Sequence, residues 1–318
     1  MPDAELLILR VSSSGPRRLD LLVLEALRQR DSKTPISRGL LKRFFRRNPP
    51  LLDGALVPSP SVELEGRHTV ALSGWSEFLA KASVLLPAER CFLPILYEDE
   101  DLLILSKDAG VPSVALSGDE THTAVAAALA RVPALASIEG AKPLEPGLLH
   151  RLDTATSGIL AFAKSAAEFA RLRALWKTPA VRKIYRAKVE ILPGALPPSA
   201  CTLREPIGHS ASSAGRMVVL PANGAPGEAA AIRGQALPAV THIRRVSPLS
   251  EGGFELEIEI ETGVMHQIRA HLASRGWPII GDRVYNPTAR PTRLMLHAWK
   301  LEVPLRSGTQ LELTSLEK

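Results

Sequence analysis

Cysteines and long apolar runs are both scarce in this chain. The 318 residues include only two cysteines, Cys91 and Cys201, which excludes a disulfide scaffold and a cysteine-rich zinc site. No apolar stretch approaches the roughly 20 residues that a membrane-spanning helix needs. Residues 1–10 contain acidic side chains and only a short apolar run, which is not the pattern of a signal peptide. We therefore expect a soluble, cytoplasmic protein that does not contact membranes.

Motifs that bind cofactors or metals are absent as well. The sequence has no glycine-rich phosphate loop, no dinucleotide fingerprint and no Gly-x-Ser-x-Gly elbow. His266 and His271 lack the spacing of a zinc-protease helix. Asp153-Thr154 is not followed by glycine and has no second copy, which argues against an aspartic-protease pair. We expect the chemistry of this chain to need no cofactor and no metal.

The size and net charge of the chain indicate what kind of protein it is and what kind of partner it binds. Hydrophobic residues make up 45% of the chain, enough for a large core in one domain, or in a domain of roughly 200 residues with a smaller companion. The net charge of +6 and the isoelectric point near 9.5 favour a polyanionic partner, although many proteins of this charge bind no nucleic acid.

Residues 17–74 have the pattern of a small separate module, preceded by an extension over residues 1–16. Apolar periodicity over residues 19–27 predicts one helix, and Thr34-Pro35 predicts the start of a second. Asp53-Gly54 between two short apolar runs predicts a hairpin with a primed turn. The second helix carries basic residues that could bind RNA phosphates: Arg38, Lys42, Arg43, Arg46 and Arg47.

The rest of the chain divides into a linker over 75–94, a catalytic domain over 95–306 and a tail over 307–318. Within the domain the sequence predicts strands at 102–105, 159–163, 184–190, 254–260 and 295–303, and helices at 121–131, 165–176 and 265–275. Residues 193–198 and 221–238, rich in proline, glycine and alanine, are expected to be irregular. Because strands and helices mix without a βαβ rhythm, we expect an α+β fold with a largely antiparallel sheet.

Two segments carry candidate chemistry. The first, residues 150–158, has the sequence His-Arg-Leu-Asp-Thr-Ala-Thr-Ser-Gly and by itself has the composition of an ordinary turn. The second, residues 261–285, contains a helix whose Ile268 and Leu272 should point inward, with Gln267 and His271 on a solvated face. Arg269 lies one position from the apolar stripe, so it could point into a cleft.

Together these segments resemble the RluA-type family of RNA pseudouridine synthases. Several motifs in the family's order carry more weight than any single one. The matching motifs, between about Leu96 and Pro304, are His150-Arg151-Leu152-Asp153 with Ser157-Gly158, Lys183-Ile184-Tyr185-Arg186-Ala187, Thr262-Gly263 with His266-Gln267-Ile268-Arg269 and His271-Leu272, Pro278-Ile279 with Gly281-Asp282, and Leu296-His297-Ala298. The chain departs from the family at Val264-Met265, where the family usually has Arg-Thr, and at Asp108, where it has proline. The N-terminal module resembles a degenerate S4 RNA-binding domain through Ile36-Ser37-Arg38 and Asp53-Gly54.

The resemblance implies a pseudouridine-synthase fold with a central active-site cleft, plus a small S4-like α/β domain. It implies a monomer that isomerises a uridine in ribosomal or transfer RNA to pseudouridine, by base flipping and without a cofactor. Asp153 matches the catalytic nucleophile, Arg269 the cation paired with it and Tyr185 the active-site tyrosine. The residues expected around the substrate are Arg151, His150, Leu296, His266 and Gln267, of which His150 is expected mainly to brace the loop.

Two other functions remain open from the sequence. A non-catalytic RNA-binding or ribosome-assembly factor could have the same fold, although the presence of Asp153, Tyr185 and Arg269 argues against it. A uridine N-glycosidase would use similar residues but would release the base. Retention of the base after turnover separates a synthase from a glycosidase.

Overall fold

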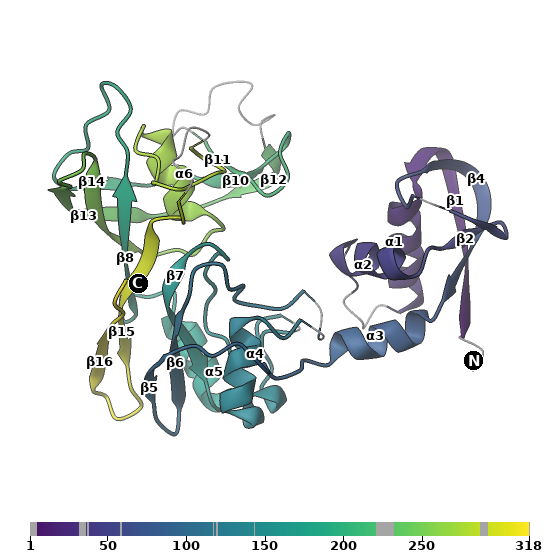
Figure 1. The fold of residues 1–318 in the computed structure, drawn as a ribbon, viewed down its shortest axis with the longest axis horizontal. Coiled ribbons are helices and arrows are strands. Elements are labelled where there is room, and N and C mark those ends of the chain that lie inside the picture. The colour runs from purple at the N-terminus through teal and green to yellow at the C-terminus, as the bar shows by residue number, and fades with distance from the viewer. Residues whose placement is uncertain are drawn as a thin grey trace.

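The computed structural model describes residues 5–31, 36, 38–57, 59–116, 118, 120–142, 144–220, 232–286 and 292–317. The chain folds into a small N-terminal unit and a larger unit, and helix α3 (Trp75–Ser83) lies between them (Figure 1). Within these ranges no helix is long and apolar enough to cross a membrane.

The N-terminal unit combines a four-stranded sheet, of order β1-β4-β2-β3, with helices. Asp53 and Gly54 have φ angles of 49° and 85°, which confirms the predicted primed turn between β2 and β3. The predicted start of the second helix at Thr34-Pro35 lies outside the described residues. In chain order the elements before α3 are β1 (Leu6–Arg18), α1 (Leu19–Arg30), α2 (Arg38–Arg47), β2 (Leu51–Leu52), β3 (Ala55–Leu56) and β4 (Glu63–Ser73).

Two parts of this unit differ from the prediction. Residues 1–16 were expected to form an extension, but β1 pairs with β4 from Leu6↔Ser73 to Arg18↔Glu63, so residues 6–16 belong to the sheet. Residues 75–94 were expected to be a linker, but α3 begins there, and Trp75 packs edge-on against the buried Phe44 with 5.0 Å between ring centroids. Both features depend on contacts between segments far apart in the sequence.

The larger unit has a nine-stranded sheet of order β5-β6-β7-β15-β8-β14-β13-β9, with β16 paired to β15. Among the described pairings in this sheet only β7 and β15 run parallel, which confirms the predicted α+β class with a largely antiparallel sheet. The main strands are β5 (Ile95–Glu98), β6 (Leu102–Lys107), β7 (Ser157–Ala163), β8 (Arg182–Val189), β9 (Cys201–Leu203), β13 (Thr241–Pro248), β14 (Phe254–Ile260), β15 (Leu296–Pro304) and β16 (Gln310–Thr314).

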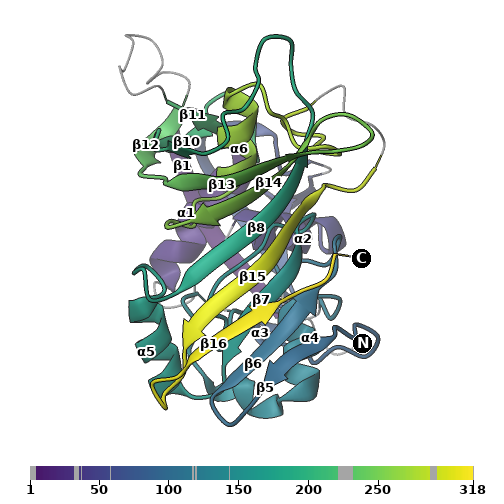
Figure 2. The same cartoon turned by 90° about the vertical axis from the view of Figure 1, so that its left-hand side faces the viewer.

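Helices cover the two faces of this sheet unequally (Figure 2). Helices α4 (Ala124–Arg131) and α6 (Gln267–Ser274) pack on one face, where Leu129 and Leu272 share a core with strand residues. A short 3-10 helix, Pro133–Ser137, follows α4. Helix α5 (Ala166–Leu175) packs on the other face, and Ser165 caps it by accepting a hydrogen bond from the backbone N–H of Glu168, as predicted.

Strands that the sequence did not predict complete the larger unit. A separate sheet of order β11-β10-β12 is built from β10 (Ile207–Ser210), β11 (Met217–Val219) and β12 (Ile232–Leu237). β12 therefore corrects the expectation that 221–238 is wholly irregular; residues 221–231 lie outside the described part. The expected tail over 307–318 contains β16, whose Thr314 pairs with Lys300 of β15.

Candidate active site

The loop that carries Asp153 is fixed by backbone contacts from the segment after β6. Ser113 Oγ donates to the carbonyl of Leu152 at 2.7 Å and accepts from the N–H of the same residue at 3.0 Å. The buried ammonium of Lys107 donates to the carbonyl of Thr154 at 3.2 Å. Burial lowers the pKa of Lys107 to about 8, and the nearby Asp153 charge opposes this shift. Asp153 is therefore held on a rigid loop, with a quarter of its side chain exposed.

The end of the loop is fixed against β15. Gly158 has φ of +114°, and a Cβ at this position would lie 2.3 Å from the carbonyl oxygen of Ala298. Only glycine allows the strands to approach this closely. Ser157 Oγ lies 2.9 Å from His297 Nδ1, and the other ring nitrogen of His297 is 3.1 Å from the carbonyl of Ser315. Ser157, Gly158, His297 and Ala298 therefore support the end of the loop.

Arg269 on α6 connects two carboxylates. Its Nη1 donates to Asp153 Oδ2 at 3.1 Å, while Nε and Nη2 donate to the two oxygens of Asp282 at 2.7 and 2.8 Å. Burial disfavours the charge of Arg269, but the hydrogen bonds and charges of the two aspartates outweigh it and raise its pKa. Asp282 is fully buried; burial acts to raise its pKa, but Arg269 and the N–H groups of Val284 and Tyr285 keep that pKa below its ordinary value. Asp282 thus fixes the guanidinium, and Nη1 is held where it donates to Asp153.

His266 lies near the same oxygen of Asp153 as Arg269. It precedes α6 in the left-handed conformation, with φ of 54° and ψ of 19°. The hydroxyl of Tyr285 accepts from the N–H of Met217 at 2.8 Å, so its own hydrogen can reach His266 Nδ1 at 3.2 Å. Burial lowers the pKa of His266. We therefore assign a neutral ring with its proton on Nε2, which lies 3.7 Å from Asp153 Oδ2.

Tyr185 on β8 and Leu296 on β15 were also expected at the site. Both are buried, and both belong to the core that includes Leu152 and Ile268. Burial raises the pKa of Tyr185, and the charge of Asp153 raises it further. The phenol therefore stays protonated at neutral pH and can donate a hydrogen bond.

Gln267 and His271 do not lie on a solvated face, and neither points to a substrate. Gln267 Nε2 donates to the carbonyl of Val240 and to Thr241 Oγ1, and its Oε1 accepts from Thr262 Oγ1 and the N–H of Val264. His271 is fully buried between Thr241 and Glu205. The prediction that Gln267 contacts substrate is therefore corrected, because all its hydrogen-bonding groups anchor α6 to β13 and the preceding loop.

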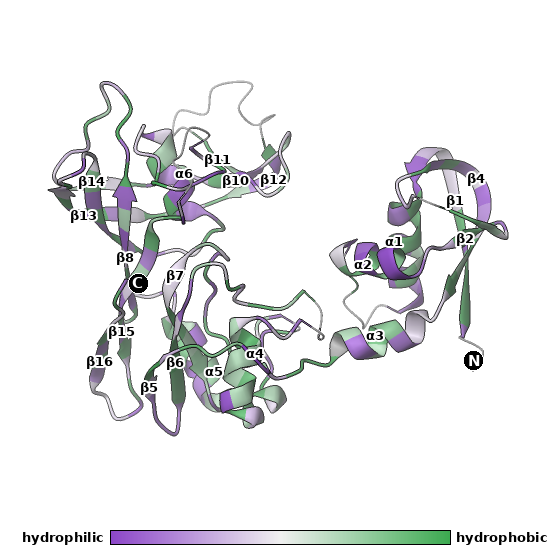
Figure 3. Cartoon of the chain, in the orientation of Figure 1, coloured by the Kyte–Doolittle hydropathy of each residue, from purple (hydrophilic) through white to green (hydrophobic). Residues whose placement is uncertain are grey.

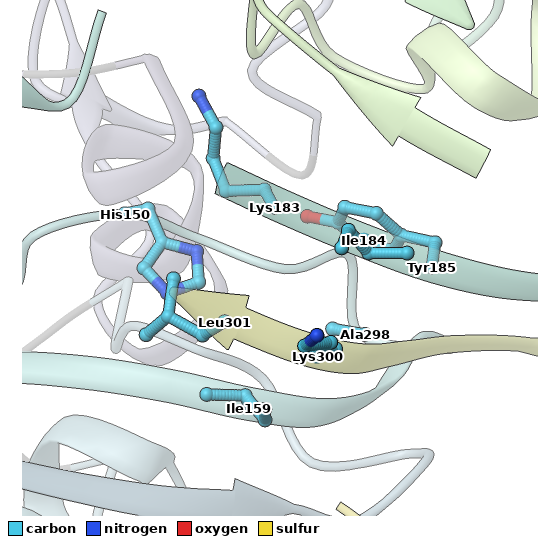
Figure 4. Close-up of a pocket in the computed structure, with 8 residues that line it drawn as sticks. All are labelled: His150, Ile159, Lys183, Ile184, Tyr185, Ala298, Lys300 and Leu301. Carbon is cyan, nitrogen blue, oxygen red and sulfur yellow. The ribbon is translucent and has the colours of Figure 1, made fainter. Parts of the chain in front are cut away.

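His150 supports the loop and does not contact Asp153 in any recorded interaction. Its ring stacks on Trp176 at 4.9 Å, and its Nε2 accepts from the N–H of Ala161 at 3.3 Å. It lines a cavity of about 10 Å³ with Lys183 and Tyr185, among others (Figure 4). A cavity of that size holds at most one water molecule, so it is a packing gap rather than a ligand site. The brace role expected for His150 fits this position, and its assignment to substrate binding does not.

His150 gives a pH prediction for stability. Burial, aided by Lys183 and Arg173, lowers its pKa to about 3, whereas an unfolded histidine has a value near 6.5. Below pH 6.5 the unfolded state takes up a proton that the folded state does not, so stability falls as the pH falls towards 3. In urea unfolding, the His150→Gln variant should lose roughly 2 kcal/mol less than the wild type between pH 7.5 and pH 5. The exposed His122→Gln is the matched control, and equal losses in all three proteins would contradict the prediction.

Arg151 is half exposed beside the site, and its Nη1 donates to the buried Glu145 at 3.3 Å. It is therefore positioned by one carboxylate and remains accessible to a ligand. Val264, which stands where the resembled family has arginine, packs instead with Ile207 and Met217 of the small sheet. The adjacent Met265 has 38% of its surface exposed.

The sequence matched Asp282 to a motif but gave it no role, and it missed Lys107 and Tyr285 as partners in the site. The Gly281-Asp282 motif could have predicted the role of Asp282. A carboxylate that occurs in the same signature as Arg269 is a natural partner for its guanidinium. Nothing in the spacing of Lys107 indicated its contact with Thr154. Among the described residues no group of three or more His, Cys, Asp or Glu side chains could hold a metal ion.

Comparison with known proteins places this geometry in a family. The family described as RNA pseudouridylate synthase matches residues 101–274. An "Uncharacterized RNA pseudouridine synthase" of Chloroflexus aurantiacus is 37% identical over 66% of this chain; the chain spans only 61% of that relative. A "Ribosomal large subunit pseudouridine synthase D" of Buchnera aphidicola is 30% identical over 86% of this chain and 77% of that protein. The solved structure of human RNA pseudouridylate synthase domain containing 1 shares the fold, with a TM-score of 0.53 at 24% identity, covering 73% of this chain and 86% of that one. The chain belongs to the RNA pseudouridylate synthase family.

Proposed function

We propose that this protein isomerises a uridine in RNA to pseudouridine, with the Asp153 carboxylate as the nucleophile. The observation that carries the proposal is the charge arrangement at Asp153: a partly exposed carboxylate accepts a hydrogen bond from Arg269, whose other donors are fixed on Asp282. A charge-assisted hydrogen bond from a fixed guanidinium orients the carboxylate for attack as a nucleophile.

The reaction balances without a co-reactant. The N1–C1′ bond of the uridine breaks, the base turns while it stays bound, and a C5–C1′ bond forms. The proton at C5 is lost and N1 gains one. Tyr185 and Leu296 are proposed to contact the uracil ring, with the protonated phenol available for hydrogen bonding. His266, with its Nε2 proton towards Asp153, is proposed to orient the carboxylate.

The uridine must leave its stack to reach Asp153. Arg151 is proposed to occupy the space that the base vacates, because its side chain is half exposed and held at one end by Glu145. The name of the Buchnera aphidicola relative suggests large-subunit ribosomal RNA as the first substrate to examine.

Pseudouridine mapping of cellular RNA tests the proposal. Cells with the gene, without it, and with only the Asp153→Asn form should be compared across ribosomal and transfer RNA. One or a few uridines should be modified only in cells that carry the unaltered gene. If the three maps are identical, the proposed activity is wrong.

The N-terminal unit is proposed to bind RNA as an S4-like module, with α2 as its contact helix. This helix has many hydrophilic residues (Figure 3), and Lys42, Arg46 and Arg47 are exposed. Arg38 instead pairs with the buried Asp20 at 2.9 Å. Arg43 contacts Glu120 at 3.1 Å and the carbonyl of Leu116, both in the larger unit. Arg38 and Arg43 are therefore proposed to have structural roles, and Lys42, Arg46 and Arg47 to make the phosphate contacts.

This arrangement predicts different effects for neighbouring cations on α2. Lys42→Gln and Arg46→Gln should each weaken RNA binding and flatten the dependence of log Kd on log salt by roughly 0.7–0.9. Arg43→Gln removes the same charge but should leave that slope unchanged and increase proteolysis in residues 84–94, because the contact between the units is lost. Binding titrations from 50 to 300 mM salt and limited trypsin digestion measure both effects. Equal slope changes in all three variants would contradict the division of roles.

A further inference from the structure

The separate sheet β11-β10-β12 lies beside the candidate active site and packs against α6 (Figure 1). Ile207 and Met217 of this sheet are buried with Ala270 of α6 and with Tyr285. The N–H of Met217 also bonds the Tyr285 hydroxyl, which in turn contacts His266. The sheet is therefore attached directly to the residues around Asp153.

Two arginines and one histidine are exposed on this sheet. His209 on β10, Arg216 before β11 and Arg233 on β12 are all exposed. Neither Asp nor Glu occurs in residues 207–220 or 232–239. A solvated surface in this protein usually mixes both signs; Arg182 and Arg244 of the main sheet, for example, are both paired with Glu259. Within the described part of the chain, neither arginine of the small sheet pairs with a carboxylate.

The strand register places His209 and Arg233 on one face of the small sheet, and Arg216 comes directly before Met217 of β11. His209 is directly opposite both Met217 and Arg233 in the strand register, so the three side chains share one face of the sheet. Met217 is buried against Tyr285 on that face. His209 is also near enough to His266 to add to the lowering of its pKa, after the larger effects of burial and of the charges of Asp153, Arg269 and Asp282.

Arg216 is held in place while most of its donors remain available. Its guanidinium carbon lies 5.2 Å from the centre of the Tyr285 ring, and Nη1 donates to the carbonyl of Val284 at 2.9 Å. The guanidinium carbon of Arg269 lies 5.3 Å from the centre of the same ring. A guanidinium has five N–H donors, so a single carbonyl bond leaves it able to bind a phosphate in fork geometry. Arg233 likewise makes one hydrogen bond to the described residues, from Nε to the carbonyl of Ser210 at 2.9 Å.

We propose that the sheet β11-β10-β12 is a second RNA-binding surface, on which Arg216, Arg233 and His209 bind the backbone phosphates next to the uridine that reaches Asp153. The proposal rests on the proposed function, since it takes RNA as the substrate of this site. A polynucleotide drawn into the site necessarily brings phosphates to its rim, and a face whose described residues include two arginines and no acid, beside Tyr285 and His266, matches that need. An acidic protein partner could use the same charges, so the experiment includes one.

The test measures binding of a labelled 20-nucleotide oligouridylate and turnover of a ribosomal RNA transcript. Arg216→Gln with Arg233→Gln should flatten the slope of log Kd against log salt by about 1.4, the value for two lost single-strand phosphate contacts. KM for the transcript should rise by about tenfold or more, with kcat changed by less than about threefold, because neither residue touches Asp153. Arg216→Lys keeps the charge and should keep most of the wild-type slope.

The exposed Arg245→Gln on β13 is the matched control for the loss of one charge. A double variant with the slope and affinity of this control would overturn the proposal. The proposal would also be overturned if polyglutamate bound to the wild type as tightly as oligouridylate and lost affinity equally in the double variant, since the surface would then suit an acidic protein.

If the wild type binds oligouridylate through these arginines but forms no pseudouridine in any RNA, the proposed function is wrong and the proposed RNA-binding surface stands. If pseudouridine forms and the double variant equals the control, the proposed function stands and the proposed RNA-binding surface is wrong.

Discussion

The Asp153→Asn variant is expected to fold and bind RNA like the wild type and to form pseudouridine at least about a thousandfold more slowly. Asparagine keeps the shape of the side chain and an oxygen that can accept from Arg269. It removes the negative charge that the proposed nucleophile requires. Arg269 remains paired with Asp282 through two hydrogen bonds, so no buried cation is left without a partner.

A single-turnover assay that counts pseudouridine in the product RNA measures this loss. The exposed Glu139→Gln is the matched control, because it removes one carboxylate charge from the same unit. A rate for Asp153→Asn within a few-fold of that control would refute the role of Asp153. The same assay should search for free uracil, because release of the base by the wild type would indicate an N-glycosidase instead.

The parts of the fold that the sequence predicted correctly are those with local periodicity. The alternation of apolar and acidic residues gave β14, Ser165 gave the start of α5, and Ile268 with Leu272 gave the buried face of α6. Each pattern reports on a single element, because a helix or a half-buried strand has a fixed spacing of inward side chains. Asp153 and Arg269, 116 positions apart, came from the family resemblance and not from any spacing.

What the sequence missed depends on partners distant in the chain. β1, β12 and β16 exist because another strand offers a free edge, which no local pattern reveals. His266 was expected inside the helix, but it adopts a left-handed conformation before α6, and this turns its ring towards Asp153 and Tyr285. Gln267 and His271 are polar, so a solvated face was the simple expectation. Both are buried because backbone carbonyls and Thr241 satisfy them.

The largest expected effect on the free energy of unfolding comes from breaking the buried ion pair of Arg269 and Asp282. Replacing Arg269 with methionine leaves a fully buried carboxylate with only the N–H groups of Val284 and Tyr285. Removing one partner of a buried pair typically costs about 3–5 kcal/mol, so Arg269→Met should unfold at much lower denaturant than the wild type. Adding Asp282→Asn should recover most of that loss, because the asparagine oxygen still accepts from both N–H groups and no unpaired charge remains.

The pH dependence separates a charge effect from a packing effect. In the wild type the pKa of Asp282 lies below its unfolded value, so this residue stabilises the fold above that value and the contribution is lost as acid protonates it. In Arg269→Met the cation is gone and burial raises the same pKa, so the sign reverses: the penalty of the buried charge decreases as the pH falls towards the new value. The stability of Arg269→Met relative to the double variant should therefore improve between pH 8 and pH 5.

Stability and catalysis should respond differently to the double change. Arg269→Met with Asp282→Asn restores the fold but not the hydrogen bond from Nη1 to Asp153, so turnover should remain at least about a hundredfold below the wild type. Asp282→Asn alone keeps Arg269 and should lose less turnover, through poorer orientation of the guanidinium. Urea unfolding at two pH values and single-turnover rates on one RNA test all three variants. A double variant as active as Asp282→Asn would show that Arg269 serves only to neutralise Asp282. The hydrogen bond from Arg269 to Asp153 would then make no contribution to turnover.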